Sequence, residues 1–243
     1  LITDGDVTTA VPTLKAYLED WLESVARPNL KPRTFDGYKS HIERHIIPAI
    51  GSRKIDRLRP SDVQAMTRAI TAKGLSSTTA LGVHRVLQKA LNDASRQGLV
   101  QKNVAALAYA PRKAITERPA LTADEAMTVM TTATGVQRAR LILAFMTGCR
   151  QGEALGLRRD LVNFILDEAG EVLRARIEFA WSIQRLSASV MALPAGQEGE
   201  RAKGGLWLVR PKTRSSWRVA TVHGAFAREL ARILGSHTSD WVC

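Results

Sequence analysis

Three residues carry side chains suited to chemistry on a phosphate group. Arg150 follows Gly148 at a predicted helix break, where a side chain can project from a buried helix onto a ligand. The planar guanidinium fork matches phosphate oxygens and can neutralise their charge without a metal. Glu153 lies three residues on, within reach of Arg150 on one helical face, so we expect it to orient the guanidinium. Lys212 lies between two predicted strands. The simpler interpretations are a surface salt bridge for Arg150 and an ordinary helix-surface carboxylate for Glu153. For Lys212 they are a solvated turn lysine or a plain phosphate contact.

The charge of the chain indicates where a polyanion would bind. Its 243 residues include 35 Lys and Arg against 23 acidic residues, a net charge of +12 with a pI near 10.3. Between Arg27 and Lys113 there are 17 basic and 5 acidic residues, so the whole excess lies in this range. This stretch is still rich in Leu, Ile, Val and Ala, which predicts a folded basic domain. A pI above about 9 is typical of nucleic-acid binding, although a generically basic protein would share it.

The first half of the chain is predicted to be helical. Apolar residues recur at helical spacing after Thr13, forming one stripe of an amphipathic helix. Three more helices follow from similar patterns and from helix-starting residues. The four are expected to begin at Leu14, Lys31, Pro60 and Ser76, the second being broken at Pro48, the third capped by Ser61 or Asp62 and the fourth ended by Gly98.

A linker is predicted at 111–120, because two prolines and several charges interrupt any periodic pattern there. It separates a frayed segment (1–12) and a helical domain (13–110) from a second domain (121–243). Beyond the linker, helices are expected near 123, at 139–146, from 152 to 157 and at 223–234. Alternating apolar residues predict strands at 162–166, 172–177, 206–209 and 218–222, the last two joined through Lys212, with a polar loop at 194–205.

Two segments of the second domain together resemble the tyrosine recombinases, the family of the phage integrases. Residues 147–158 (TGCRQGEALGLR) resemble the first arginine box of that family, and residues 211–219 (PKTRSSWRV) resemble its β-hairpin lysine segment. The helical first half, with 33–38 and the acid-poor helix 77–96, resembles its core-binding domain. The resemblance covers about residues 10–235. It implies a mainly α fold with a small β-sheet: a SAM-like core-binding domain followed by a truncated α+β catalytic domain.

The resemblance also implies a reaction and partners. Members of the family cleave one DNA strand with a tyrosine, form a 3′-phosphotyrosyl link and rejoin the strand to another 5′-hydroxyl, with four subunits holding two DNA sites. Attack on a phosphodiester produces a phosphorane with extra negative charge, which Arg150 would stabilise. Lys212 would protonate the departing 5′-oxygen. Thr213, Arg214 and Arg218 would grip the DNA backbone. Neither a metal nor a cofactor is expected.

Binding of double-stranded DNA by the basic domain is expected to come mainly from phosphate neutralisation, with some groove contacts from the fourth helix. Any one of these residues could instead be solvated surface. The predicted contacts are Lys31, Arg33, Tyr38, His84, Arg85, Lys89 and Arg96.

No nucleophile is expected in this chain, because the three tyrosines, Tyr17, Tyr38 and Tyr109, all precede Arg150. The family places its nucleophile, and a second His/Lys-x-x-Arg box, after the hairpin. The chain alone is therefore predicted to be inactive. One alternative is a naturally truncated, inactive DNA-binding protein that occupies recombination sites, and another is a basic helical regulator unrelated to recombination.

The remaining signals set limits on the compartment and on metal binding. The two cysteines, Cys149 and Cys243, offer neither a disulfide framework nor a metal-site spacing, so a reducing cytoplasm is expected. No apolar run is long enough to cross a membrane. His41 and His45 have the spacing of a helical metal pair, but no third ligand is evident, so no metal site is predicted.

Overall fold

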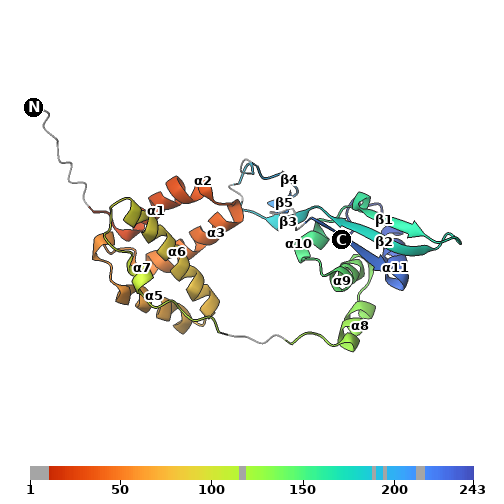
Figure 1. The fold of residues 1–243 in the computed structure, drawn as a ribbon, viewed down its shortest axis with the longest axis horizontal. Helices are drawn as coiled ribbons and strands as arrows, with labels where there is room; N and C mark the ends of the chain where they lie inside the picture. The colour runs from red at the N-terminus through yellow and green to blue at the C-terminus, as the bar shows by residue number, and fades with distance from the viewer. Residues whose placement is uncertain (1–10, 115–118, 188–189, 194–195, 212–216) are drawn as a thin grey trace, which may run out of the picture. The chain divides into compact units, whose positions relative to one another are not determined.

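Helices make up the first of two separate units, and helices with two small sheets make up the second (Figure 1). The computed structural model describes residues 11–114, 119–187, 190–193, 196–211 and 217–243. Unit 1 is Leu1–Glu117 and unit 2 is Arg118–Cys243. The division between them falls inside residues 111–120. The predicted fold class, mainly α with a small amount of β-sheet, is confirmed.

Unit 1 contains α-helices, two π-helical turns and one 3₁₀ turn. Its elements are α1 (Leu14–Trp21), a π turn (Leu22–Ala26), α2 (Arg27–Asn29), α3 (Pro32–His41), a second π turn (Ile42–Ile46), α4 (Ile47–Ile50), a 3₁₀ turn (Ile55–Arg57), α5 (Pro60–Ala72), α6 (Ser77–Arg96) and α7 (Val104–Leu107).

Each π turn allows a helix to continue through a proline. The break predicted at Pro48 is wrong, because the helix runs on to Ile50. A proline in a regular helix clashes with the carbonyl four residues earlier. In the π turn the N–H of Ile47 instead donates to the carbonyl of Ile42, five residues earlier, which widens the turn just before Pro48. The same kind of bond, from the N–H of Arg27 to the carbonyl of Leu22, carries the first helix on into α2, which contains Pro28.

Two helix starts show how the polar residues serve as caps. Ser76, where the fourth helix was expected to begin, caps α6 by accepting a hydrogen bond from the N–H of Thr79 at 3.1 Å. For α5 the prediction of Ser61 or Asp62 as the cap is wrong, because the helix already begins at Pro60. Asp62 lies inside the first turn, where its carboxylate accepts a hydrogen bond from the N–H of Arg59 at 3.0 Å.

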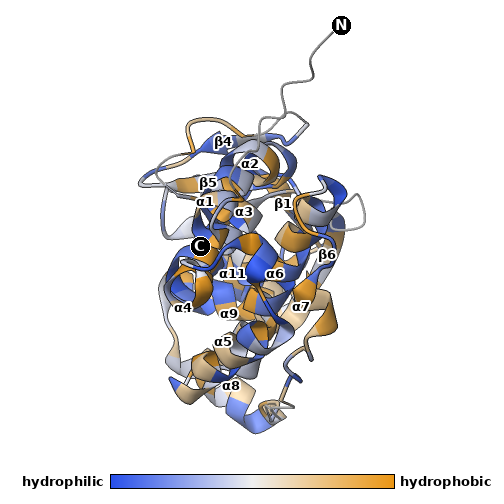
Figure 2. Cartoon of the chain, turned by 90° about the vertical axis from the view of Figure 1, so that its left-hand side faces the viewer, coloured by the Kyte–Doolittle hydropathy of each residue, from blue (hydrophilic) through white to orange (hydrophobic). Residues whose placement is uncertain are grey.

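The core of unit 1 is built around the inner face of α6, whose Val83, Leu87 and Ala90 are fully buried. Two polar bonds attach α1 to this helix. The hydroxyl of Tyr17 donates to the carbonyl of Ala90 at 2.7 Å, and the indole N–H of Trp21 donates to the carboxylate of Asp93 at 2.9 Å. The short helix α7 is apolar throughout and is orange in Figure 2.

Unit 2 begins with three helices and ends with one. Its elements are α8 (Ala123–Thr132), α9 (Gly135–Thr147), α10 (Gln151–Leu155), a 3₁₀ turn (Arg159–Leu161), β1 (Val162–Leu166), β2 (Val172–Phe179), β3 (Ser182–Arg185), β4 (Gly199–Arg201), β5 (Leu206–Val209), β6 (Arg218–His223) and α11 (Gly224–Gly235).

The strands form two antiparallel sheets, one ordered β1-β2-β6 and the other β3-β5-β4. The predicted hairpin of 206–209 with 218–222 is therefore wrong, since β5 pairs with β3 and β4 while β6 pairs with β2. The prediction of 194–205 as loop misses β4. The first sheet packs with α9 and α11 around a core that includes Leu143, Ile177 and Leu230.

Truncating Leu87 to alanine should destabilise unit 1 by about 2–5 kcal/mol, because its side chain is fully buried in α6 and leaves a cavity. The readout is a urea titration followed by amide hydrogen exchange of the α6 backbone. Lys89→Ala, an exposed position on the same helix, is the matched control and should change stability by less than about 0.5 kcal/mol. Equal effects of the two changes would contradict the assigned inner face.

Candidate functional site

The start of α10 places Arg150 at an exposed corner. Helix α9 ends at Thr147, and Gly148 adopts φ +62°, a left-handed conformation that glycine adopts without strain. The chain then reverses through Cys149, which is buried, and Arg150 is the extended residue that precedes α10. The side chain of Arg150 is 74% exposed, so its guanidinium is available to a ligand in solution.

Glu153 holds Arg150 from inside the protein. The carboxylate oxygen Oε1 accepts a hydrogen bond from Nη1 of Arg150 at 3.0 Å, and Oε2 accepts one from the backbone N–H of Arg150, also at 3.0 Å. Glu153 itself is only 4% exposed. The predicted contact between the two residues is therefore present, while their chemical roles stay predictions.

Arg218 is a third member of this cluster, and its part in it was not predicted. Its Nη2 donates to Oε2 of Glu153 at 2.9 Å, from the first residue of β6. Its guanidinium carbon also lies 5.0 Å from the ring centroid of Phe179, its partner in the β2–β6 register. Residues 153 and 218 are distant in sequence, so only the tertiary fold reveals this bond. The prediction for Arg218 considered only a DNA contact.

The two arginines keep Glu153 ionised. Burial raises the pKa of this carboxyl, but hydrogen bonds from Arg218 and from the backbone and side chain of Arg150, together with the charge of Arg218, outweigh burial. The net result is a pKa below the ordinary value of 4.5. A buried carboxylate is stable only when it is paired in this way.

Close backbone contact fixes α10 against β3. A Cβ added at Gly152 would lie 2.6 Å from the hydroxyl oxygen of Ser182 and 2.8 Å from the carbonyl oxygen of Ile183. At Gly156 it would lie 3.0 Å from the backbone nitrogen of Ile183. These glycines allow the short helix to touch the strand, which sets the position of the Arg150–Glu153 pair relative to the second sheet.

The segment after α11 is attached beside α10 by Arg159. Its Nη2 donates to the carbonyls of Leu234 and His237 at 2.6 and 2.5 Å, and its Nε donates to the carbonyl of Ser239 at 3.1 Å. These bonds satisfy backbone acceptors that a helix end leaves open. A further backbone bond, from Val242 N–H to the carbonyl of Leu157 at 3.0 Å, continues the attachment.

Lys212, Thr213 and Arg214 lie outside the described residues, so their predicted roles stay predictions. On either side of that segment, Arg210 and Trp217 contact each other. The guanidinium carbon of Arg210 lies 4.5 Å from the ring centroid of Trp181 and 4.8 Å from that of Trp217. The indole N–H of Trp217 donates to Glu178 at 2.8 Å.

Unit 1 presents most of its predicted DNA contacts to solution. Arg85, Lys89 and Arg96 are exposed, and their spacing places them on one outer face of α6. Lys31 and Arg33 are exposed at the start of α3. Of the predicted contacts in unit 1, two are less accessible.

His84 must be removed from the predicted DNA contacts, and Tyr38 is partly buried. His84 is 2% exposed on the inner face of α6, where burial lowers its pKa. It lies in register with Ala80, Leu87 and Leu91, so helical spacing alone could have placed it in the core. The ring of Tyr38 stacks on Trp21 at a centroid distance of 6.2 Å and packs against the core of unit 1.

The described tyrosines and cysteines differ in accessibility. Tyr17 is buried, and burial together with the nearby Asp93 and Asp20 raises the pKa of its hydroxyl. Tyr109 is 88% exposed. Burial raises the pKa of the Cys149 thiol and, despite the nearby Arg140, raises that of Cys243 to about 11, so both thiols are protonated at neutral pH.

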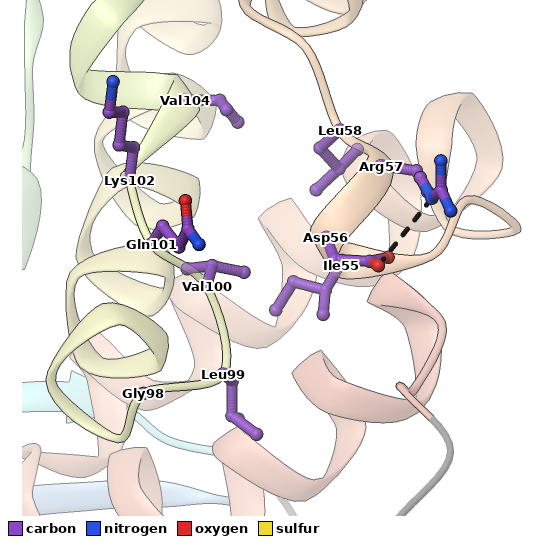
Figure 3. A pocket seen from close by; sticks show the side chains of 10 residues that line it. All are labelled: Ile55, Asp56, Arg57, Leu58, Gly98, Leu99, Val100, Gln101, Lys102 and Val104. Atoms are coloured by element: carbon purple, nitrogen blue, oxygen red, sulfur yellow. Dashed lines mark ion pairs between the residues drawn. The ribbon is translucent and has the colours of Figure 1, made fainter.

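A pocket of about 600 Å³ in unit 1 contains none of the predicted site residues. Ile55 and Leu58 line one side of it, and Val100 and Val104 line the other (Figure 3). Within the described ranges, no cluster of three or more His, Cys, Asp or Glu residues is suited to a metal ion. No helix in that part of the chain is long and apolar enough to span a membrane.

Residues 13–68 match the family model of the phage integrase N-terminal SAM-like domain. An integrase of Saccharopolyspora erythraea is 30% identical over 154 residues, covering 62% of this chain and 35% of that protein. A tyrosine recombinase XerC-like protein of Caldanaerobacter subterraneus subsp. tengcongensis is 29% identical over 160 residues, covering 63% of this chain and 41% of that protein. Over part of its length the chain is therefore similar to integrases and tyrosine recombinases.

The fold of the chain is similar to that of solved integrases. The Tn1549 transposon integrase in complex with a circular intermediate DNA matches 93% of this chain and 66% of its own, with a TM-score of 0.69 and 18% identity. A lambda integrase dimer bound to a COC' core site matches 67% of this chain and 48% of its own, with a TM-score of 0.56 and 21% identity. The chain spans between 35% and 41% of the length of the curated relatives it matches.

Replacing Glu153 by glutamine should destabilise unit 2 at pH 7 by about 1–3 kcal/mol, because two arginines lose a charged acceptor. Since the folded-state pKa is depressed, the stabilisation is fully present above the ordinary value of 4.5 and is lost as the pH falls through the folded-state pKa. The melting temperature of the native protein should therefore fall as the pH drops below 4.5, and Glu153→Gln should flatten this dependence. Glu168→Gln, in the exposed β1–β2 turn, is the control and should leave the native profile unchanged.

Proposed function

We infer that the chain is the DNA-binding portion, with part of the active site, of a site-specific DNA recombinase. The enzyme cleaves and rejoins DNA through a 3′-phosphotyrosyl intermediate, and the nucleophilic tyrosine lies outside this chain. The observation that carries the proposal is the exposed guanidinium of Arg150, held from behind by the buried Glu153. The relatives support the reaction class, because their names are integrase and tyrosine recombinase.

In this mechanism Arg150 binds the scissile phosphate and stabilises the charge that develops in the phosphorane. Glu153 orients it and cannot serve as the proton donor, because its depressed pKa keeps it ionised at neutral pH. Lys212 donates a proton to the departing 5′-oxygen, and Thr213 and Arg214 contact the DNA backbone. No metal or cofactor is needed, because guanidinium and ammonium groups supply the positive charge.

The proposed partners are double-stranded DNA at a crossover site and other recombinase subunits, four on two sites. Two observations on similar structures support them: the lambda integrase tetramer was solved on a Holliday junction, and the Tn1549 integrase with a circular intermediate DNA. The basic face of α6 supplies the non-specific part of the affinity. Since its substrate would be cellular or phage DNA, we place the chain in the cytoplasm of a bacterial or phage-infected cell.

Selection from a random duplex library tests this proposal, with affinity followed against salt concentration. Enrichment of a half-site about a dozen base pairs long, in inverted pairs, is the expected result, since subunits related by symmetry read inverted half-sites. Steeply salt-dependent binding without an enriched sequence would reduce the chain to a general DNA-binding module. Absence of binding would overturn the proposal.

The double change Arg85→Ala and Lys89→Ala should reduce the slope of log affinity against log salt by about 1.8, because each residue neutralises one phosphate. Lys15→Ala removes from α1 a lysine that is paired with Glu19 at 3.8 Å, and should leave the slope unchanged. Arg150→Ala should weaken duplex affinity by no more than the several-fold contribution of a single phosphate contact, because many others remain. A control slope that falls as far as that of the α6 variant would contradict the assigned face.

The chain alone should form no covalent adduct with a nicked duplex that traps the phosphotyrosyl intermediate. Tyr17 is buried, and neither Tyr38 nor Tyr109 is proposed as the nucleophile. Gel electrophoresis under denaturing conditions is the measurement. A covalent protein–DNA band from the 243-residue chain would show that one of these tyrosines does attack.

A further inference from the structure

Glu153 is shared between two arginines that come from different parts of unit 2. Its Oε1 accepts from Nη1 of Arg150 at 3.0 Å, while its Oε2 accepts from Nη2 of Arg218 at 2.9 Å. Oε2 also accepts from the backbone N–H of Arg150. Both carboxylate oxygens are therefore used, and the side chain of Arg150 reaches only one of them.

The two guanidinium groups are presented differently. The side chain of Arg150 is 74% exposed and that of Arg218 is 30% exposed. The guanidinium of Arg218 faces the ring of Phe179, a fully buried residue of β2, which covers one of its faces. Arg150 is thus the cation of this cluster that a ligand in solution can reach, and Arg218 is turned toward the protein.

We propose that Arg218 is a positioning residue that keeps Arg150 open for phosphate. An arginine and a carboxylate prefer two parallel hydrogen bonds, which use one whole edge of the guanidinium. By occupying Oε2, Arg218 prevents Glu153 from taking Arg150 in such a two-bond pair. Arg150 is then held by Nη1 alone, and within the described residues its Nε and Nη2 have no hydrogen-bond partner.

The charges of the cluster fit this role. One carboxylate between two guanidinium groups leaves one net positive charge, which suits a single phosphate. Without Arg218, Glu153 would neutralise Arg150 alone, and the exposed corner would carry no net charge. The inference rests on the proposed function, because it assumes that a phosphate is what Arg150 binds. It assigns Arg218 to Glu153 instead of to the DNA backbone.

Chemical modification of arginine by phenylglyoxal tests the proposal on the chain itself. The reagent attacks a free guanidinium edge, and mass spectrometry of peptides gives the rate at Arg150. In Arg218→Ala the freed Oε2 closes the two-bond pair, so modification of Arg150 should slow by at least about twofold, the scale of one exposed ion-pair contact. Arg218→Lys retains a donor for Oε2 and should restore most of the native rate.

The direction of the change separates positioning from simple structural support. Loss of support would loosen the corner and speed the modification of Arg150, so a rate that rises or stays the same overturns the proposal. Arg174, exposed on β2, is the internal control and should react equally in every variant. If Arg218→Ala does not fold, Arg218→Gln replaces it in the test. Its neutral amide is a weaker donor to Oε2, so Arg150 should be modified more slowly than in the native protein. A rate that rises or stays the same would again overturn the proposal.

A second arm distinguishes failure of this inference from failure of the proposed function. Addition of the selected duplex to the native chain should protect Arg150 from phenylglyoxal and leave Arg174 reactive. If the duplex binds without protecting Arg150, the phosphate contact in the proposed function is wrong. The effect of Arg218→Ala on the free protein would still decide whether Arg218 sets the geometry of Arg150.

Discussion

The ionised carboxylate of Glu153, buried and shared by two arginines, is the constraint on which the geometry of unit 2 depends. A charge in this position is tolerated only when its hydrogen-bond partners are placed accurately. The end of α9, the start of α10 and the β2–β6 register must all be correct for Arg150 and Arg218 to meet it. The glycine contacts between α10 and β3 serve the same requirement, since they bring the helix close to the second sheet.

Unit 1 follows a different physical design. Charged residues of its helices lie on exposed faces around an apolar core. In the proposed function, many separate phosphate contacts would give an affinity that is strong at low salt and tolerant of single changes. Unit 2 instead depends on a few side chains held at fixed distances. This contrast suits a protein in which one domain supplies attraction and the other supplies chemistry.

Local signals in the sequence were sufficient for much of the fold. The strands β1 and β5 have the predicted bounds, α6 begins within one residue of its predicted start, and the Arg150–Glu153 contact follows from a spacing of three residues. Non-local features were missed. The bond between Arg218 and Glu153 depends on sheet register, and β3 and β4 are short strands with little apolar alternation. His84 was misplaced because its chemistry was weighed above its position on the buried stripe of α6.

The two π turns affect how this chain can be compared with its relatives. Each holds one residue more than a regular turn, and every extra residue rotates the following helix by about 100°. A relative with a regular helix there would be one residue shorter before the positions of Pro28 and Pro48. An alignment drawn without that gap would pair the exposed Ala49 with such a relative's counterpart of Ile50, which is buried here. A comparison with a relative whose helix is regular across α3 and α4 would therefore need a one-residue insertion, even where the residues on both sides look alike.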